Sequence, residues 1–188
     1  MQMHTGRWIS VVMVVLVASV GVNVLQAQKI RALVSRPSVA SPVIGKQVLS
    51  LRGVSPHGAP IDIALKGALP TVLYHFSSSC GWCERNWRNI EAVAEAAAGR
   101  YRVVAVTTEK NVQSYLQQRG ISLEVVEQID PELERLLNLA GTPKTLAIGS
   151  DGVVTHEWLG AYQNRVGRQI EELFGLTLPG TAPAHGTD

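Results

Sequence analysis

The two cysteines of the chain are Cys80 and Cys83, separated by Gly81 and Trp82. At the start of a helix, two thiols at this spacing lie within one turn and can form a disulfide with each other. The first helical turn has unpaired N–H groups and a partial positive charge, which stabilise a thiolate on the first cysteine. We therefore expect Cys80 to be the nucleophile. Cys83, which should be more buried, is expected to resolve the mixed disulfide that Cys80 forms.

The residues near the cysteines help to decide among other functions that a cysteine pair can have. A c-type haem site needs His directly after the second cysteine, where this chain has Glu84, so haem attachment is excluded. Zinc needs two further ligands, and His75 alone does not supply them. A peroxiredoxin-like peroxidase stays an alternative, because Ser77 offers a hydroxyl three residues before the first cysteine, although Leu73 occupies the place of an expected proline. A redox-silent interaction domain is the remaining alternative.

Hydrophobic periodicity predicts the elements that position the cysteines. The near-continuous apolar run at residues 71–76 is typical of a central strand buried on both faces. Residues 83–98 have apolar side chains three and four apart and are followed by Gly99, which indicates a helix and its end. Residues 101–107 and 111–119 predict a second strand and a second helix. The cysteine pair therefore lies between a buried strand and a helix, inside a β-α-β unit.

The flanking segments are predicted in the same way. A short hairpin should precede the main sheet, and a helix with Asp130 as its N-cap should follow the β-α-β unit. The turn at 149–152 joins two strands that should pair antiparallel. The predicted fold class is α/β, with a central mixed sheet flanked by helices. These further elements occupy residues 47–54, 61–63, 130–139, 144–148, 153–158 and 162–174.

The N-terminal segment is the most apolar part of the chain. Arg7 is the only charged residue among the first 28, and residues 8–28 form an uncharged run of 21. As a helix this run would span roughly 30 Å, enough to cross a bilayer once. A signal peptide cleaved after residues 17–19 is the alternative. Both an anchor and a signal peptide imply that the rest of the chain is exported across the membrane. The predicted organisation is an anchor or signal segment at 1–28, a linker at 29–44, a domain at 45–175 and a flexible tail at 176–188.

Composition and charge exclude two broad classes of protein. With 46% hydrophobic and 17% charged residues, the 188-residue chain is not intrinsically disordered. All 15 acidic groups and all but one of the 17 basic groups lie beyond residue 28, so this part is almost neutral. It has no basic run long enough to follow a phosphate backbone, and we expect no nucleic-acid partner.

Together these motifs resemble the thioredoxin-like superfamily, and more narrowly the membrane-anchored, extracytoplasmic thiol-disulfide oxidoreductases of the TlpA/ResA type. The resemblance covers residues 45–175 and rests on the cysteine motif after a buried strand, on Gly141-Thr142-Pro143 before a strand and on the 149–152 turn. It implies a thioredoxin fold with an extra N-terminal hairpin, preceded by one transmembrane helix. It also implies that Pro143 is cis and faces the disulfide, and that the backbone of Thr142 pairs with an extended substrate chain.

The resemblance implies an enzyme that exchanges a dithiol for a disulfide with exported proteins, as a reductant in the maturation of cytochrome c or another cofactor protein. A membrane thiol carrier would supply its electrons. No cofactor beyond the redox-active Cys80–Cys83 disulfide and no metal is expected. The expected location is the bacterial cytoplasmic membrane, single-pass, with the domain facing the periplasm or the outside; a soluble periplasmic protein is the alternative. A dithiol oxidant also stays open, because nothing in the sequence fixes how stable the Cys80 thiolate is.

Four residues near the cysteines are further candidates for the site. An exposed Trp82 would line a substrate groove, and the resemblance implies that Gly81 and Trp82 tune the reduction potential. Glu84 is ionisable and adjacent to Cys83, but neighbouring helix residues point about 100° apart, so a solvated side chain is the simpler interpretation. His75 is a candidate base, although its apolar strand favours a packed, hydrogen-bonded imidazole.

The chain departs from its apparent relatives at two positions that bear on proton transfer. Thioredoxin has a buried Asp six residues before the first cysteine, where this chain has Tyr74. Several TlpA-type reductases have a Glu three residues after the second cysteine, where this chain has Asn86. The group that accepts the proton of Cys83 is therefore unassigned by the sequence.

Overall fold

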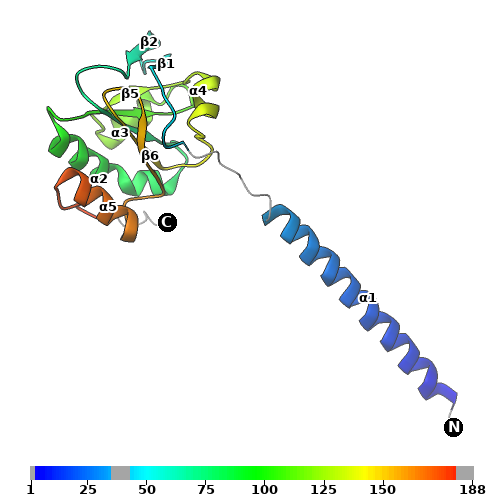
Figure 1. The fold of residues 1–188 in the computed structure, drawn as a ribbon. Coiled ribbons are helices and arrows are strands. Elements are labelled where there is room, and N and C mark those ends of the chain that lie inside the picture. The colour runs from blue at the N-terminus through cyan, green and yellow to red at the C-terminus, as the bar shows by residue number, and fades with distance from the viewer. Residues whose placement is uncertain (1–2, 35–42, 181–188) are drawn as a thin grey trace. The chain divides into compact units, whose positions relative to one another are not determined.

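The computed structural model describes residues 3–34 and 43–180, which belong to two separate units (Figure 1). The first unit contains helix α1 (Met3–Val34), which includes the predicted N-terminal helix and continues into the range predicted as a linker. Among the described residues, no helix combines the length and the apolar character that a membrane span requires. Within α1, the Asn23 amide donates to the Ser19 carbonyl at 2.9 Å. The predicted helix is confirmed, and the predicted transmembrane helix is not.

The second unit is built on a five-stranded sheet with a two-stranded sheet beside it. In the larger sheet the strand order is β5-β4-β3-β6-β7; β3, β4 and β5 are parallel, and β6 is antiparallel to both of its neighbours. The strands are β1 (Ser50–Val54), β2 (Pro60–Ala64), β3 (Thr71–His75), β4 (Arg102–Val106), β5 (Glu124–Val126), β6 (Lys144–Ile148) and β7 (Val154–Leu159). The helices of this unit are α2 (Gly81–Ala97), α3 (Gln113–Arg119), α4 (Pro131–Leu136) and α5 (Asn164–Phe174).

Strand β3 lies in the centre of the sheet, and all five of its residues are buried. Tyr74 belongs to the core cluster that includes residues of α2 and α5. Leu73 belongs to a second cluster, with Leu51 and Ile63 from the β1–β2 hairpin. Because successive side chains of a strand point to opposite faces, a strand between two cores is buried along its whole length, which favours apolar residues at most of its positions. This explains the run from which the central strand is predicted.

The other predicted elements are present with small shifts. Strand β5 is missing from the prediction because three residues, Glu124–Val126, are too short to show a period. Helix α4 ends at Leu136 instead of residue 139, and Asn138 adopts a left-handed conformation with a φ of 48°. Helix α5 begins two residues later than predicted, and the backbone N–H of Tyr162, before the helix, donates to the side chain of Asn86 at 2.9 Å.

Residues just outside the predicted domain (45–175) also pack against its core. Val43 is fully buried, and the backbone N–H of Gly45, two residues later, donates to the carbonyl of Val154 at 2.8 Å. After α5, Leu178 packs against the core cluster, and its backbone N–H donates to Glu171 at 2.9 Å. Residues 35–42 of the predicted linker (29–44) and residues 181–188 of the predicted tail (176–188) lie outside the described residues.

Candidate active site

Cys80 and Cys83 lie at the N-terminus of α2. Cys80 is the N-cap residue, with extended backbone angles (φ −88°, ψ 105°), and its Sγ accepts a hydrogen bond from the backbone N–H of Cys83 at 3.3 Å. A capping side chain is aimed at the unpaired N–H groups of the first turn. Cys80 is partly exposed, whereas Cys83 is fully buried in the core. The two thiols are therefore close neighbours with different access to solvent.

The two thiols have opposite pKa shifts. Burial raises the pKa of Cys80, but hydrogen bonds from the Cys83 and Thr142 side chains and from the backbone of Cys83 and Trp82 outweigh it and bring the pKa below its ordinary value. Burial raises the pKa of Cys83 to about 12, and its neighbour Cys80 contributes to the rise. Since the thiolate is the reactive form, Cys80 is the better nucleophile near neutral pH.

The loop before β6 brings Thr142 and Pro143 to the cysteines. The Thr142–Pro143 peptide bond is cis, and Pro143 is buried. The Cys80 thiol donates to the backbone carbonyl of Thr142 at 3.5 Å, across 62 positions of sequence. The backbone next to Cys80 is thus supplied by a distant part of the chain.

The side chains of α2 next to the thiols form an exposed edge. The Trp82 ring is 46% exposed, and the Arg85 guanidinium lies 3.7 Å from its centre, which is a cation–π contact. The same guanidinium donates to the Gly81 carbonyl at 3.3 Å. Glu84 forms an ion pair with Arg119 of α3 at 2.6 Å. The carboxylate of Glu84 is therefore bound to an arginine and does not contact the thiols.

His75 is buried and lies on the opposite face of β3 from Tyr74, which shares a core cluster with Cys83. Its Nδ1 lies 3.2 Å from the carbonyl of Gly141; because a carbonyl only accepts, Nδ1 carries the hydrogen. Burial lowers the pKa of His75, and the nearby charge of Lys144 lowers it further. A neutral imidazole in this place holds the loop before Thr142.

Tyr74 and Asn86 lie together under α2. The Asn86 amide nitrogen donates to the Tyr74 hydroxyl at 3.3 Å, while the Asn86 oxygen accepts from the backbone of Tyr162 and from the side chain of Asn89, both at 2.9 Å. Burial raises the pKa of Tyr74 well above its ordinary value, and the neighbouring Cys83 contributes to the rise. Both groups therefore stay neutral, and neither can act as a base near neutral pH.

Sequence reasoning misses one acidic residue at the site. Glu109 follows β4, and its carboxylate accepts hydrogen bonds at 3.1 Å from the backbone N–H of Ser78, two residues before Cys80. The Ser78 hydroxyl also donates to it. The topology offers a clue, because the carboxyl ends of the parallel strands β3 and β4 meet at one edge of the sheet. Among the described residues, no group of three or more His, Cys, Asp or Glu side chains is placed to bind a metal.

No protein-family model and no curated protein matches the chain significantly, but solved structures do. A putative thiol:disulfide interchange protein DsbE from Chlorobium tepidum matches with a TM-score of 0.56 and 20% identity, over 70% of this chain and 94% of that one. The thioredoxin domain of a thiol-disulfide oxidoreductase from Bacteroides vulgatus matches with a TM-score of 0.56 and 12% identity, over 70% and 97%. This chain has the thioredoxin fold. StoA from Bacillus subtilis is similar as well, with a TM-score of 0.54 and 18% identity, over 67% and 98%.

The thioredoxin fold of this chain agrees with the sequence-based prediction of a mixed sheet flanked by helices and an added β1–β2 hairpin. In this thioredoxin fold the cysteine pair and the cis proline come from two loops that the central strands β3 and β6 bring together. The narrower resemblance to the TlpA/ResA type stays a prediction.

Proposed function

We propose that this thioredoxin-like domain is a thiol-disulfide oxidoreductase that exchanges a dithiol for a disulfide with exported proteins. The proposal rests mainly on the environment of the Cys80 thiol. It caps α2, has a lowered pKa, lies 3.5 Å from the Thr142 carbonyl and is partly exposed, with the buried Cys83 within hydrogen-bonding distance. These are the properties of an attacking thiol that has a resolving partner.

The exchange proceeds in two steps. The Cys80 thiolate attacks a disulfide of the client protein, so that a bond forms between Cys80 and one client sulfur while the client S–S bond breaks; the other client sulfur leaves and takes up a proton. Cys83 then loses its proton and attacks the Sγ of Cys80. The Cys80–Cys83 disulfide forms, and the second client thiol is released. Two electrons pass from the enzyme to the client, and the reverse sequence oxidises a client dithiol.

The client is an extended polypeptide segment in this proposal. The backbone of Thr142 adjoins Cys80, and Trp82, two residues after Cys80 in the sequence, is exposed. Backbone pairing gives affinity without demanding a particular client sequence, and an exposed aromatic ring adds apolar contact. The buried Pro143 would form the wall behind the segment.

The physiological direction in this proposal is reductive, in the maturation of cytochrome c or another cofactor protein, with electrons from a membrane thiol carrier. The groups that lower the pKa of Cys80 are neutral ones: a thiol, a hydroxyl and two backbone N–H groups. Strongly oxidising dithiols need a strongly stabilised thiolate, which neutral donors supply less well than a charged partner does. The uncharged run at residues 8–28 would export the domain. A reporter fused to the C-terminus that is active only outside the cytoplasm tests the export.

The reduction potential of the Cys80–Cys83 pair tests both the activity and its direction. The full chain is equilibrated with defined ratios of reduced and oxidised glutathione or dithiothreitol, and the disulfide fraction is measured by thiol alkylation. A potential near or below about −270 mV supports a reductant. A value near about −120 mV would make the protein an oxidant. Failure to form the intramolecular disulfide would overturn the proposed function.

A further inference from the structure

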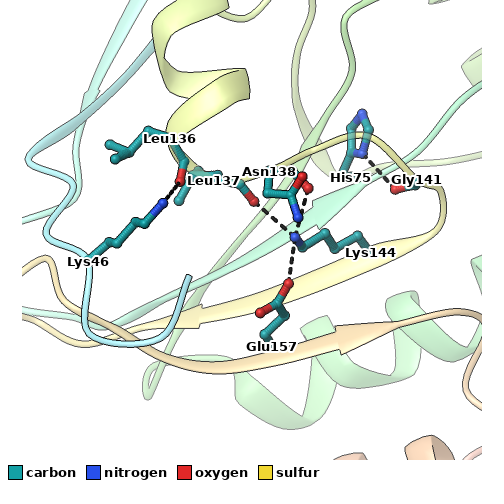
Figure 2. A network of polar contacts seen from close by, with 8 residues as sticks. All are labelled: Lys46, His75, Leu136, Leu137, Asn138, Gly141, Lys144 and Glu157. Carbon is teal, nitrogen blue, oxygen red and sulfur yellow. Dashed lines mark hydrogen bonds and ion pairs between the residues drawn. The ribbon is translucent and has the colours of Figure 1, made fainter. Parts of the chain in front are cut away.

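The loop that presents Thr142 to Cys80 is held by a buried lysine. We call residues 137–143 the Thr142 loop; it joins α4 to β6. Lys144, the first residue of β6, has a side chain that is only 3% exposed. Its ammonium donates to the carbonyls of Leu137 at 2.9 Å and Asn138 at 2.8 Å, at the start of the Thr142 loop (Figure 2).

The charge of Lys144 is compensated from the next strand. Glu157 of β7 accepts at 2.6 Å from the same ammonium, as Figure 2 shows. An ammonium has three N–H groups, and these three oxygens use all of them. Removing one partner from such a buried, fully satisfied network is costly, so the network favours one loop conformation.

A second side chain holds the other end of the Thr142 loop. His75 of β3 is the register partner of Lys144 and donates to the carbonyl of Gly141, the residue before Thr142, at 3.2 Å. Further along this face of β6, Leu146 and Ile148 are buried in an apolar cluster. The polar contacts of Lys144 and His75 are thus confined to the end of the sheet that adjoins the Thr142 loop.

We propose that Lys144 is a positioning residue for client binding: by holding the start of the Thr142 loop, with Glu157 and His75 beside it, Lys144 keeps the Thr142 backbone in place against Cys80. The proposal rests on the proposed function. It assigns to Lys144 an effect on polypeptide clients, which need the Thr142 backbone. A small disulfide that meets only the Cys80 sulfur needs no such backbone and should be little affected.

The chain offers a matched control for a lysine at this helix end. Lys46 donates to the carbonyl of Leu136, next to the Leu137 carbonyl that Lys144 binds, at 3.0 Å, but Lys46 does so at the exposed surface (Figure 2). The two lysines therefore bind the carbonyls of consecutive residues at the C-terminal end of α4, Leu136 in the helix and Leu137 at its C-cap. Lys144 alone of these two also binds Asn138 inside the Thr142 loop. A change that depends only on the carbonyls of α4 should appear in both variants.

The test compares Lys144→Met and Lys46→Met in the full chain. Each protein is first reduced with dithiothreitol and freed of it, so that its own dithiol supplies the two electrons of one turnover. It is then mixed with a disulfide-bonded polypeptide, insulin, or with a small aromatic disulfide, 5,5′-dithiobis(2-nitrobenzoate). The insulin concentration that gives half of the maximal rate is taken as KM, and the maximal rate constant as kcat. We expect Lys144→Met to raise KM for insulin about tenfold, with kcat and the small-disulfide rate constant within about twofold of wild type. Lys46→Met should behave as wild type. An unchanged KM for insulin, an equal loss on both substrates, or the same rise in Lys46→Met would overturn the positioning role.

A second variant covers a failure of Lys144→Met to fold, and the wild-type activity distinguishes the positioning role from the proposed function. If Lys144→Met does not fold because it leaves the half-buried Glu157 unpaired, the double variant Lys144→Met/Glu157→Leu removes both charges together and should give the same rise in KM. The wild-type protein separates the two proposals. If the wild type reduces neither substrate, the proposed function fails and the positioning role falls with it. If the wild type is active and the folded variants keep its KM, only the positioning role fails.

Discussion

The hydroxyl of Tyr74 accepts a hydrogen bond from the side-chain amide of Asn86 at 3.3 Å, and both residues are completely buried. These are the two positions at which the sequence differs from the acidic residues expected in its apparent relatives. The structure places them in contact with each other, and Tyr74 shares a core cluster with Cys83. A neutral pair thus occupies the region from which a carboxylate would assist the buried thiol.

The first prediction concerns the pH dependence of thiol reactivity. A lowered pKa gives more thiolate at a given pH, so the alkylation rate of Cys80 in the reduced protein should level off at a lower pH than that of an ordinary thiol. Because its pKa is raised to about 12, Cys83 should be almost unreactive at pH 8. Mass spectrometry of iodoacetamide-treated protein between pH 5 and pH 10 measures both. Faster labelling of Cys83 than of Cys80 would contradict the assignment of roles.

The second prediction concerns the resolving step. Asn86→Asp retains an oxygen that accepts from Tyr162 and places a second oxygen where the Tyr74 hydroxyl can donate to it. Residue 86 lies three positions after Cys83 on α2, so we expect the new carboxylate to accept the proton of Cys83. Resolution of a preformed mixed disulfide at pH 7 should therefore accelerate at least about tenfold, a modest gain for general base catalysis. Single-turnover release of the second client thiol measures the rate.

The matched control for this step is Tyr74→Phe, which removes only the hydroxyl. Because burial holds the pKa of Tyr74 far above neutral, the hydroxyl is no base, and its loss should leave the pH dependence of resolution unchanged. The lost hydrogen bond should cost about 1 kcal/mol in the free energy of unfolding. Slower resolution in Asn86→Asp than in wild type, with the fold intact, would exclude a role for this region in proton transfer.

The third prediction concerns covalent intermediates. In Cys83→Ala the mixed disulfide between Cys80 and a client cannot be resolved within the protein, so exported proteins should accumulate as adducts. Non-reducing electrophoresis before and after treatment with dithiothreitol detects them. Cys80→Ala should form none. An equal yield of adducts in both single variants would mean that Cys80 is not the attacking thiol.

The fourth prediction concerns Glu109 and the stability of the loop before Cys80. Burial raises the pKa of Glu109, but hydrogen bonds from Ser77 and Ser78 outweigh it, so the folded pKa lies below the ordinary value. The charge therefore stabilises the fold above the unfolded pKa of about 4.3, and this contribution is lost as pH falls through the lower folded pKa. Glu109→Gln should reduce the free energy of unfolding by about 1 kcal/mol at pH 7, a figure discounted for solvent screening.

Urea denaturation of wild type and Glu109→Gln at pH 7 and pH 3 measures this contribution. The difference between the two proteins should shrink at pH 3, where Glu109 of the wild type also gains a proton. A difference of the same size at both pH values would mean that the charge of Glu109 does not stabilise the loop.

Local patterns determined the elements that carry the candidate site. The apolar run that forms β3 and the three-and-four spacing that forms α2 are properties of short segments. The spacing predicts a helix from residue 83, two residues after the observed start of α2 at Gly81. The position of two thiols one turn apart, the more buried one second, follows from helix geometry alone. For these reasons the sequence by itself predicted the fold class and the cysteine pair.

Tertiary structure decided what surrounds the cysteine pair. The Thr142 carbonyl reaches Cys80 across 62 positions because β3 and β6 pair antiparallel, and no local pattern encodes that pairing. The buried ammonium of Lys144 has no sequence signature either, since lysine is ordinarily a surface residue. The shifts in the pKa of both thiols depend on burial and on hydrogen bonds from other residues, which exist only once the two cores have packed. The candidate reactive residues were predicted from the sequence, whereas their environment was fixed by contacts between distant segments.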